Sequence, residues 1–323
     1  MKQMKNKILT LVMTSVTVMS VLGGCGRNES KQTTYKQYGV NALENGQYKE
    51  AIKSLDSALK QSNGKVGKKE IEICFYKGEA QYLSGDAKGA IKTYTSLINY
   101  DNNAKAYYLR GNVYLSQSQE KKAINDYKKA LEEDEKDYEL YIGIYNSLAN
   151  DGEEKEAKEY LNKALNIDKN KAYDKMQKGR IYNLLGKKDK AIGLLKEAID
   201  DGEKEAYFYL GDIYADSSKK SDKDEANKNF KKHMEESDLS SEEYYRFGKS
   251  LMKEDKYGYS LSYFLNGLKL EEVPNKQALM KKAISAYEHT GDFKSAKELM
   301  KKYVESYPSD EAAKSEYVFL KTR

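Results

Sequence analysis

The chain has 323 residues, of which 33% are charged, 39% are hydrophobic and only two are proline. Lysine and arginine alternate closely with aspartate and glutamate, and the formal net charge is only +5, so the sequence offers no basic face for nucleic acid and predicts no nucleic-acid partner. The composition suits many exposed helices rather than one thick globular core, and no sustained alternating run predicts a strand.

The N-terminal segment has the layout of a secretory signal. Three lysines stand within residues 1–7, and the 14 residues that follow, ILTLVMTSVTVMSV, are almost wholly apolar. A run of that length is short for a membrane-spanning helix but normal for the apolar part of a signal peptide. The sequence therefore predicts export of the chain.

The four residues after this run, Leu22-Gly23-Gly24-Cys25, resemble the lipobox of bacterial lipoproteins. In that family the signal is cut just before the cysteine, which carries the lipid. The resemblance implies removal of residues 1–24, a lipid such as palmitate on Cys25, a polar linker over 25–31, and a position on the extracytoplasmic face of the cell membrane. An ordinary signal peptide or an N-terminal anchor helix with a chance cysteine remains the alternative.

Small residues recur at a fixed interval after the linker. An alanine pair repeats every 34 residues, as Ala123 and Ala130, Ala157 and Ala164, and Ala191 and Ala198. A glycine recurs as Gly39, Gly78, Gly111, Gly179, Gly211 and Gly248. Small residues inside helices mark close helix packing, and a period of about 34 residues indicates a helical repeat array.

The best-fitting repeat resembles the tetratricopeptide repeat, through Tyr107, Arg110, Gly111, Tyr114, Ala123, Tyr127 and Ala130. That family implies an all-α, right-handed superhelical solenoid, here of about eight helix pairs over residues 32–308. The repeats start near Gln32, Ile71, Ala104, Tyr138, Ala172, Lys204, Ser241 and Gln277. Residues 62–70 and 216–225 are expected to be longer loops.

The last segment, residues 309–323, is expected to be a capping helix. Ser309 can cap its N-terminus, and Ala313, Tyr317 and Leu320 fall on one face. Such a helix covers the apolar end that the last repeat of an array would otherwise expose.

No set of residues predicts catalysis, a cofactor or a metal. The two histidines, His233 and His289, lie far apart in sequence, and no cluster of His and Cys has the spacing of metal ligands. Cys74 is expected to be a buried packing residue. We therefore expect a protein that is not an enzyme.

The family resemblance places a binding groove on the first helix of each pair, helix A. Its fifth positions read Phe75, Tyr108, Ile142, Met176, Phe208 and Tyr245, and its ninth positions include Asn112, Asn146 and Arg180. The sequence leaves open whether the fifth-position row lines a groove or packs between helices. As a groove it would hold an apolar or aromatic segment of a protein or peptide, and Tyr108, Phe208 and Tyr245 would be exposed in the free protein.

These features together predict a membrane-anchored, extracytoplasmic lipoprotein that acts as a protein-binding scaffold. A receptor for cell-envelope glycans or other ligands, with sugar rings stacked on tyrosines, is one alternative. An assembly factor for envelope or pilus machinery is another.

Overall fold

The computed structural model describes residues 27–167 and 171–323, and these residues form 17 α-helices and no strand. The chain divides into two compact units, residues 1–168 and 169–323. The signal segment and Cys25 lie outside the described residues. Eight helix pairs followed by one further helix match the predicted solenoid and its cap.

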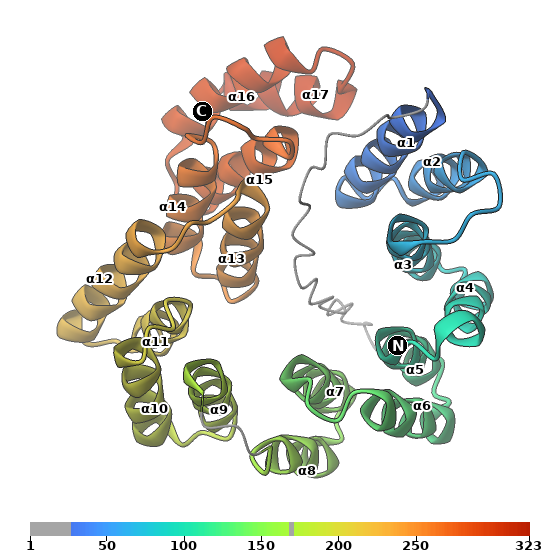
Figure 1. The fold of residues 1–323 in the computed structure, drawn as a ribbon. Helices are drawn as coiled ribbons and strands as arrows, with labels where there is room; N and C mark the ends of the chain where they lie inside the picture. Colours follow the sequence, from blue (N-terminus) through green and yellow to red (C-terminus); the bar gives the residue numbers. More distant parts are fainter. Residues whose placement is uncertain (1–26, 168–170) are drawn as a thin grey trace, which may run out of the picture. The chain divides into compact units, whose positions relative to one another are not determined.

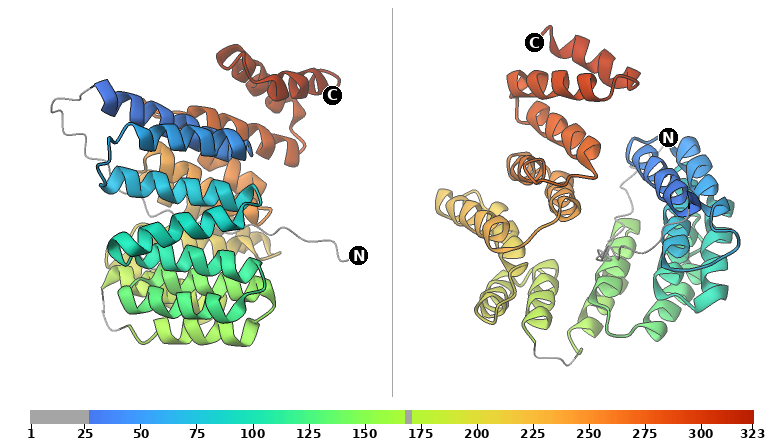
Figure 2. Two further views of the ribbon diagram at one scale, coloured as in Figure 1. Left: turned by 90° about the vertical axis from the view of Figure 1, so that its right-hand side faces the viewer. Right: turned by 45° about the horizontal axis from the view of Figure 1, so that its top comes forward.

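The first unit contains four helix pairs (Figure 1). Its helices are α1 (Arg27–Glu44), α2 (Tyr48–Lys60), α3 (Lys68–Leu83), α4 (Ala87–Asp101), α5 (Ala104–Ser116), α6 (Glu120–Glu133), α7 (Tyr138–Asp151) and α8 (Glu154–Ala164). The left view of Figure 2 shows them stacked one above another from α1, in blue, towards the green helices. The helices A, α1, α3, α5 and α7, form one layer, and their partners form the other.

The second unit continues the pattern with four more pairs and a last helix (Figure 1). Its helices are α9 (Ala172–Leu184), α10 (Lys188–Asp200), α11 (Ala206–Ala215), α12 (Lys220–Glu236), α13 (Ser241–Lys253), α14 (Tyr257–Gly267), α15 (Lys276–His289), α16 (Phe293–Ser306) and α17 (Glu311–Leu320). Here the helices A are α9, α11, α13 and α15.

The recurring small residues lie where helices pack closely, as their spacing predicts. All six alanines of the repeated pairs are fully buried. A Cβ added at Gly111 in α5 would lie 2.7 Å from the Tyr127 ring of α6, so only a residue without a side chain fits there. The glycine of helix A and the alanines of helix B thus let the two helices of a repeat approach closely.

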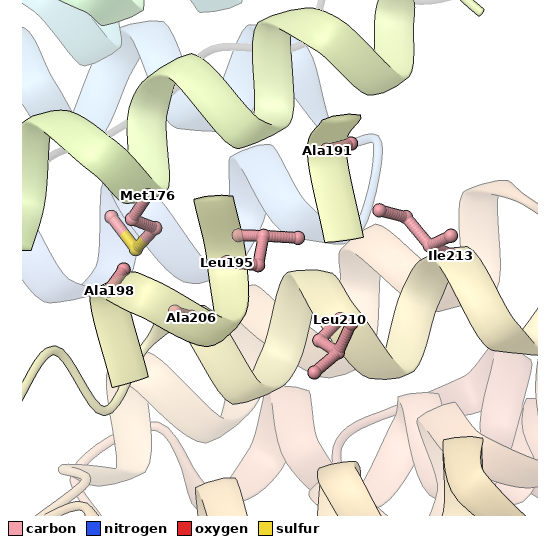
Figure 3. Packing of buried hydrophobic residues seen from close by; sticks show 7 residues of the cluster. All are labelled: Met176, Ala191, Leu195, Ala198, Ala206, Leu210 and Ile213. Atoms are coloured by element: carbon pink, nitrogen blue, oxygen red, sulfur yellow. The ribbon is translucent and has the colours of Figure 1, made fainter. Parts of the chain in front are cut away.

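The same packing continues between repeats. Figure 3 shows a cluster in the second unit in which Met176 of α9 lies beside Ala198 of α10 and Ala206 of α11. The cluster is completed by Ala191, Leu195, Leu210 and Ile213, and every member is buried. Neither helix pair could bury this apolar surface alone, which is why the array is stable only as a stack.

Three segments differ from the sequence expectation. The polar stretch expected as a linker is helical from Arg27, where α1 begins. Residues 220–225, expected in a loop, form the first turns of α12. The capping helix is present, but Asp310 rather than Ser309 caps it, because the Asp310 carboxylate accepts the hydrogen bond of the Ala313 amide at 3.1 Å.

Candidate partner-binding surface

The fifth-position row is buried, so of the two interpretations that the sequence leaves open the structure favours packing between helices. Tyr108, Phe208 and Tyr245 lack the exposure that a groove would require. The exposed fractions are 7% for Phe75, 8% for Tyr108, 4% for Ile142, 0% for Met176, 3% for Phe208 and 8% for Tyr245. These side chains fill the space between helices and are not available to a partner in this structure.

Tyr108 shows why the row is buried. Its ring lies on the backbone of the next helix A, where a Cβ added at Gly143 would be 2.8 Å from the Tyr108 Cζ. The ring also lies 6.2 Å from that of Tyr127. In the second unit the Phe208 ring of α11 lies 4.5 Å from the Phe247 ring of α13. The fifth position therefore joins successive helices A.

The ninth-position residues are in three different situations. Asn112 is buried, and its Oδ1 accepts a hydrogen bond from the Tyr127 hydroxyl at 2.7 Å. Asn146 and Arg180 are half-buried. The Arg180 guanidinium lies over the Tyr209 ring at 4.4 Å, and its Nη1 donates to Gln177 at 2.6 Å. Asn146 and Arg180 are therefore the predicted groove residues that keep partial access to solvent.

Arg180 belongs to a polar cluster that links α9, α11 and α13. The Tyr209 hydroxyl donates to Glu205 at 3.0 Å, and Arg246 Nη1 lies 3.6 Å from the same carboxylate oxygen. All four side chains are half-buried. We call Arg180, Glu205, Tyr209 and Arg246 the arginine cluster; it carries two guanidinium groups and one carboxylate.

Of the arginine cluster, only Arg180 was predicted from the sequence; Glu205, Tyr209 and Arg246 were not. Glu205 occupies the second position of its helix A, and Tyr209 and Arg246 occupy the sixth. The signal in the sequence is a tyrosine or an arginine at the sixth position of adjacent repeats, directly after the apolar fifth-position row.

Cations on the helix-A layer of the first unit contact side chains of neighbouring helices A. Lys36 of α1 pairs with Glu72 of α3 at 2.6 Å. The Lys105 ammonium of α5 lies 4.8 Å from the centre of the Phe75 ring. Burial lowers the pKa of Lys105, although Glu79 and Glu72 oppose this effect. Cations and carboxylates here satisfy one another across successive helices.

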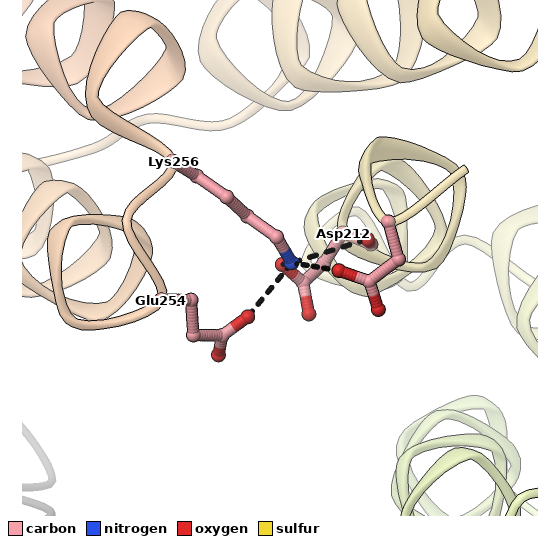
Figure 4. Close-up of polar contacts among 4 residues, drawn as sticks. Asp212, Glu254 and Lys256 are labelled. Atoms are coloured by element: carbon pink, nitrogen blue, oxygen red, sulfur yellow. Dashed lines mark hydrogen bonds and ion pairs between the residues drawn. The ribbon is translucent and has the colours of Figure 1, made fainter. Parts of the chain in front are cut away.

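A half-buried lysine, Lys256, in the turn between α13 and α14, joins that repeat to α11 of the repeat before it. Lys256 Nζ lies 2.5 Å from a carboxylate oxygen of Asp212, 2.7 Å from one of Glu254 and 2.9 Å from one of Asp216. Figure 4 shows the lysine ammonium reaching Asp212 and Glu254. Burial, with the nearby Glu254 carboxylate, raises the pKa of Asp212 to about 6. We call Lys256 together with Asp212, Asp216 and Glu254 the lysine clip. Its ion pairs join the sixth repeat to the seventh.

The histidines do not form a site. His233 is buried with Nδ1 2.9 Å from the Tyr263 hydroxyl, and burial lowers its pKa to about 3. His289 is exposed, and its ring stacks on Tyr257 with 4.0 Å between centres. Among residues 27–167 and 171–323, no group of three or more His, Cys, Asp or Glu side chains could hold a metal ion.

Cys74 is half-buried, and burial raises the pKa of its thiol. A raised pKa leaves the thiol protonated and poorly nucleophilic at neutral pH. It is therefore suited to packing in α3 rather than to chemistry.

Two pockets formed by the described residues are small. One of about 260 Å³ lies beside Arg110 and Tyr114, and one of about 200 Å³ lies between Ile284, Met300 and Ala313. Pockets for drug-sized ligands hold about 300–1,000 Å³. Both pockets lie below that range.

Paired helices in register, with buried small residues, define the chain as a helical-repeat scaffold. Models of the tetratricopeptide repeat match residues 39–104, 104–137, 146–171 and 277–310. The chain is therefore a tetratricopeptide-repeat protein, and the predicted family is confirmed. Proteins of this family generally serve as protein-interaction scaffolds.

Solved structures that match the chain include two described as tetratricopeptide repeat proteins. A tetratricopeptide repeat protein from Parabacteroides merdae is 16% identical, with 80% of this chain and 99% of that chain covered and a TM-score of 0.39. A thermophilic protein of the same repeat class from Thermus thermophilus is 17% identical, with 53% and 91% covered and a TM-score of 0.36. The MamA protein is 22% identical, with 56% and 97% covered and a TM-score of 0.34. No curated protein matches the sequence.

Proposed function

We propose that the chain is an extracytoplasmic lipoprotein, held on the cell membrane by lipid on Cys25, that binds a protein partner through its repeats. The order of basic residues, apolar run and Leu22-Gly23-Gly24-Cys25 supports the lipid anchor. In the described part of the chain, no helix is both long enough and apolar enough to cross a bilayer.

The arginine cluster is the observation that carries the proposed binding face. It lies on the helix-A layer of the second unit, where the apolar fifth-position residues are buried and the half-buried side chains are charged or aromatic. The cluster brings two guanidinium groups, Arg180 and Arg246, to this layer with partial access to solvent. Guanidinium groups bind carboxylates in a bidentate geometry. The partner we propose is a protein segment with exposed carboxylates, in place of the apolar segment that the sequence suggested.

The glycan-receptor alternative is weakened by the same burial. Stacking on sugars requires open aromatic faces, and the tyrosines of the predicted row, Tyr108 and Tyr245, are each 8% exposed. A role as an assembly factor is a special case of the proposed function, because it also requires a protein partner.

The anchor is tested by replacing Cys25 with serine. The unchanged chain should incorporate a fatty-acid analogue during growth, and Cys25→Ser should remain an unlabelled precursor that keeps residues 1–24. Cys74→Ser is the matched control and should label normally. Equal labelling of the Cys25 variant would refute the lipid anchor.

The binding face is tested by reversing its charge. Arg180→Glu combined with Arg246→Glu should reduce the yield of the partner co-isolated from membranes at least about tenfold, since interface arginines are frequent hot spots worth about 2 kcal/mol or more. Lys188→Glu with Lys196→Glu, two exposed lysines of α10, is the control and should leave the yield unchanged. Loss in the control pair, with none in the arginine pair, would place the partner on the helix-B side instead.

A further inference from the structure

The first helix begins almost at the proposed lipid. α1 starts at Arg27, only two residues after Cys25, and it continues without interruption to Glu44. Two residues can span at most about 7 Å, so a lipid on Cys25 would hold the start of α1 at the membrane surface. The linker expected over residues 25–31 would have allowed more freedom, but most of it belongs to the helix.

One face of α1 is not used by the packing of the repeats. Lys31, Thr34, Tyr35 and Tyr38 are all exposed. Thr34 and Tyr35 each lie three or four residues from both Lys31 and Tyr38, so the four side chains form one stripe. Tyr35 is 39% exposed and Tyr38 is 61% exposed. The buried side of the same helix is formed by Gln32, Gly39, Ala42 and Leu43.

The residues of this stripe suit a lipid headgroup region. Tyrosine is enriched at membrane–water interfaces, because its ring enters the apolar boundary while its hydroxyl stays in water. Lys31 adds a cation on the same stripe, and a basic residue near an anionic bilayer is attracted to its negative surface. No other exposed tyrosine among the described residues lies so close in sequence to Cys25.

We propose that the stripe Lys31, Thr34, Tyr35 and Tyr38 rests in the headgroup region of the membrane to which the chain is anchored. This inference rests on the proposed lipid at Cys25. Two tyrosines and one lysine are too few for stable binding from solution. A tether of two residues, however, raises the local concentration of the helix at the surface to about the millimolar range or above. The lipid would then attach the protein, and the stripe would hold α1 parallel to the surface.

A tryptophan probe tests the stripe directly, because the chain contains no tryptophan. The chain from Cys25 onward, carrying Cys74→Ser, is coupled through the Cys25 thiol to maleimide-bearing lipid. The vesicles contain phosphatidylglycerol and phosphatidylethanolamine, with brominated lipid as a quencher. Tyr38→Trp reports on the stripe, and Tyr100→Trp, at a tyrosine of α4 that is 56% exposed, is the control.

The expected result is a shift of emission to shorter wavelength and a loss of intensity with brominated lipid for Tyr38→Trp, with neither change for Tyr100→Trp. Adding Lys31→Glu and Tyr35→Ser to the Tyr38→Trp chain should abolish both changes. Emission from Tyr38→Trp that matches the control, or that survives the added substitutions, would overturn the proposal. The coupling is chemical, so this outcome is independent of whether cells attach lipid to Cys25, which the labelling of Cys25→Ser decides separately.

Discussion

The third repeat and the junction of the sixth and seventh repeats join their helices in different ways. In the third repeat, Gly111 lies against the Tyr127 ring, and Ala123 and Ala130 are fully buried. Its main ion pair stays inside the repeat, where the Arg110 guanidinium donates to Asp126 at 2.7 and 2.8 Å. Close approach of small residues holds this region together.

At the junction of the sixth and seventh repeats, a ring stands at a position that a small residue occupies in the third repeat. His233 occupies the place of the second helix-B alanine and lies 4.5 Å from the Phe247 ring, which packs at the same distance from Phe208. Its ion pairs cross between repeats, through the lysine clip at Lys256. The same scaffold thus accepts either small residues in close contact or large rings with buried ionizable groups. In the second solution, Asp212 and His233 should each make a contribution to stability that depends on pH, because the pKa of each is shifted by burial.

The largest effect should follow from filling the space at Gly111. Gly111→Val would place its Cβ 2.7 Å from the Tyr127 ring and 3.3 Å from the Ala123 carbonyl oxygen, which cannot move away freely. We expect a loss of about 3 kcal/mol in the free energy of unfolding.

Hydrogen exchange should show this loss in α5, α6 and their neighbours, because each repeat contacts mainly the adjacent ones. Gly193→Val is the control, since nothing lies within 4 Å of a Cβ added there. Equal destabilisation by the two variants would mean that the close approach at Gly111 is unimportant.

A somewhat smaller loss should follow from removing the lysine clip. Lys256→Met leaves the carboxylates of Asp212, Asp216 and Glu254 without their shared cation. Breaking a fully buried ion pair costs about 3 kcal/mol and an exposed one at most about 1 kcal/mol, so we expect a loss of about 2 kcal/mol for this partly buried group. The loss should be smaller at pH 5 than at pH 7, because protonation of Asp212 relieves the repulsion. Thermal unfolding at both pH values checks this, with the exposed Lys301→Met as a control that should change little. A loss independent of pH would contradict the role assigned to Asp212.

The junction should also contain two pH effects of opposite sign. The pKa of Asp212 is raised to about 6, so its contribution to stability is full at low pH and is lost as the pH rises through 6. The pKa of His233 is lowered to about 3, so its contribution is full above the ordinary pKa of about 6.5 and is lost as the pH falls towards 3. Between about pH 4 and 6 the two slopes nearly cancel.

Replacing one of the two residues should remove its pH effect and leave the pH dependence of the free energy of unfolding that the other residue causes. Relative to the parent chain, Asp212→Asn should lose about 1.4 kcal/mol per unit as the pH falls from 6 to 4, and His233→Phe should gain about the same amount. Unfolding by urea at several pH values measures both. Slopes of the same sign in the two variants would refute the assignment.

The smallest effect concerns the capping helix. Asp310 caps α17 and also accepts hydrogen bonds from Lys281 and the Tyr303 hydroxyl, both at 2.8 Å. Asp310→Ala should cost about 1 kcal/mol and increase hydrogen exchange in α17, whereas Ser309→Ala should change neither. The opposite ranking of the two variants would restore Ser309 as the cap.

Much of the fold could be predicted from the sequence, because the period of small residues is a local and repeated signal. The repeat starts expected at Ala104, Tyr138, Ala172 and Ser241 coincide with the first residues of α5, α7, α9 and α13. The eight helix pairs and the final helix followed from that register. Close packing of Gly111 on Tyr127 followed from residue size alone.

The candidate site was harder to predict, because helical period identifies a face without showing how near the next helix lies. Tyr108 is covered because Gly143 stands opposite it in α7, a match between the fifth and sixth positions of adjacent repeats. The lysine clip joins Lys256 to Asp212 across 44 residues, and no local pattern signals such a contact. Both features depend on distances between repeats.

Photo-cross-linking on intact membranes would test the proposed scaffold most directly. A photoreactive residue is placed at Tyr173, an exposed residue of α9 that lies seven positions before Arg180 and so on the same face, or at Lys196 on α10. The account predicts a partner cross-linked from position 173 and not from 196, and its loss when Arg180→Glu and Arg246→Glu are added. Cross-linking from 196 alone, or from 173 with no effect of the arginine substitutions, would contradict it.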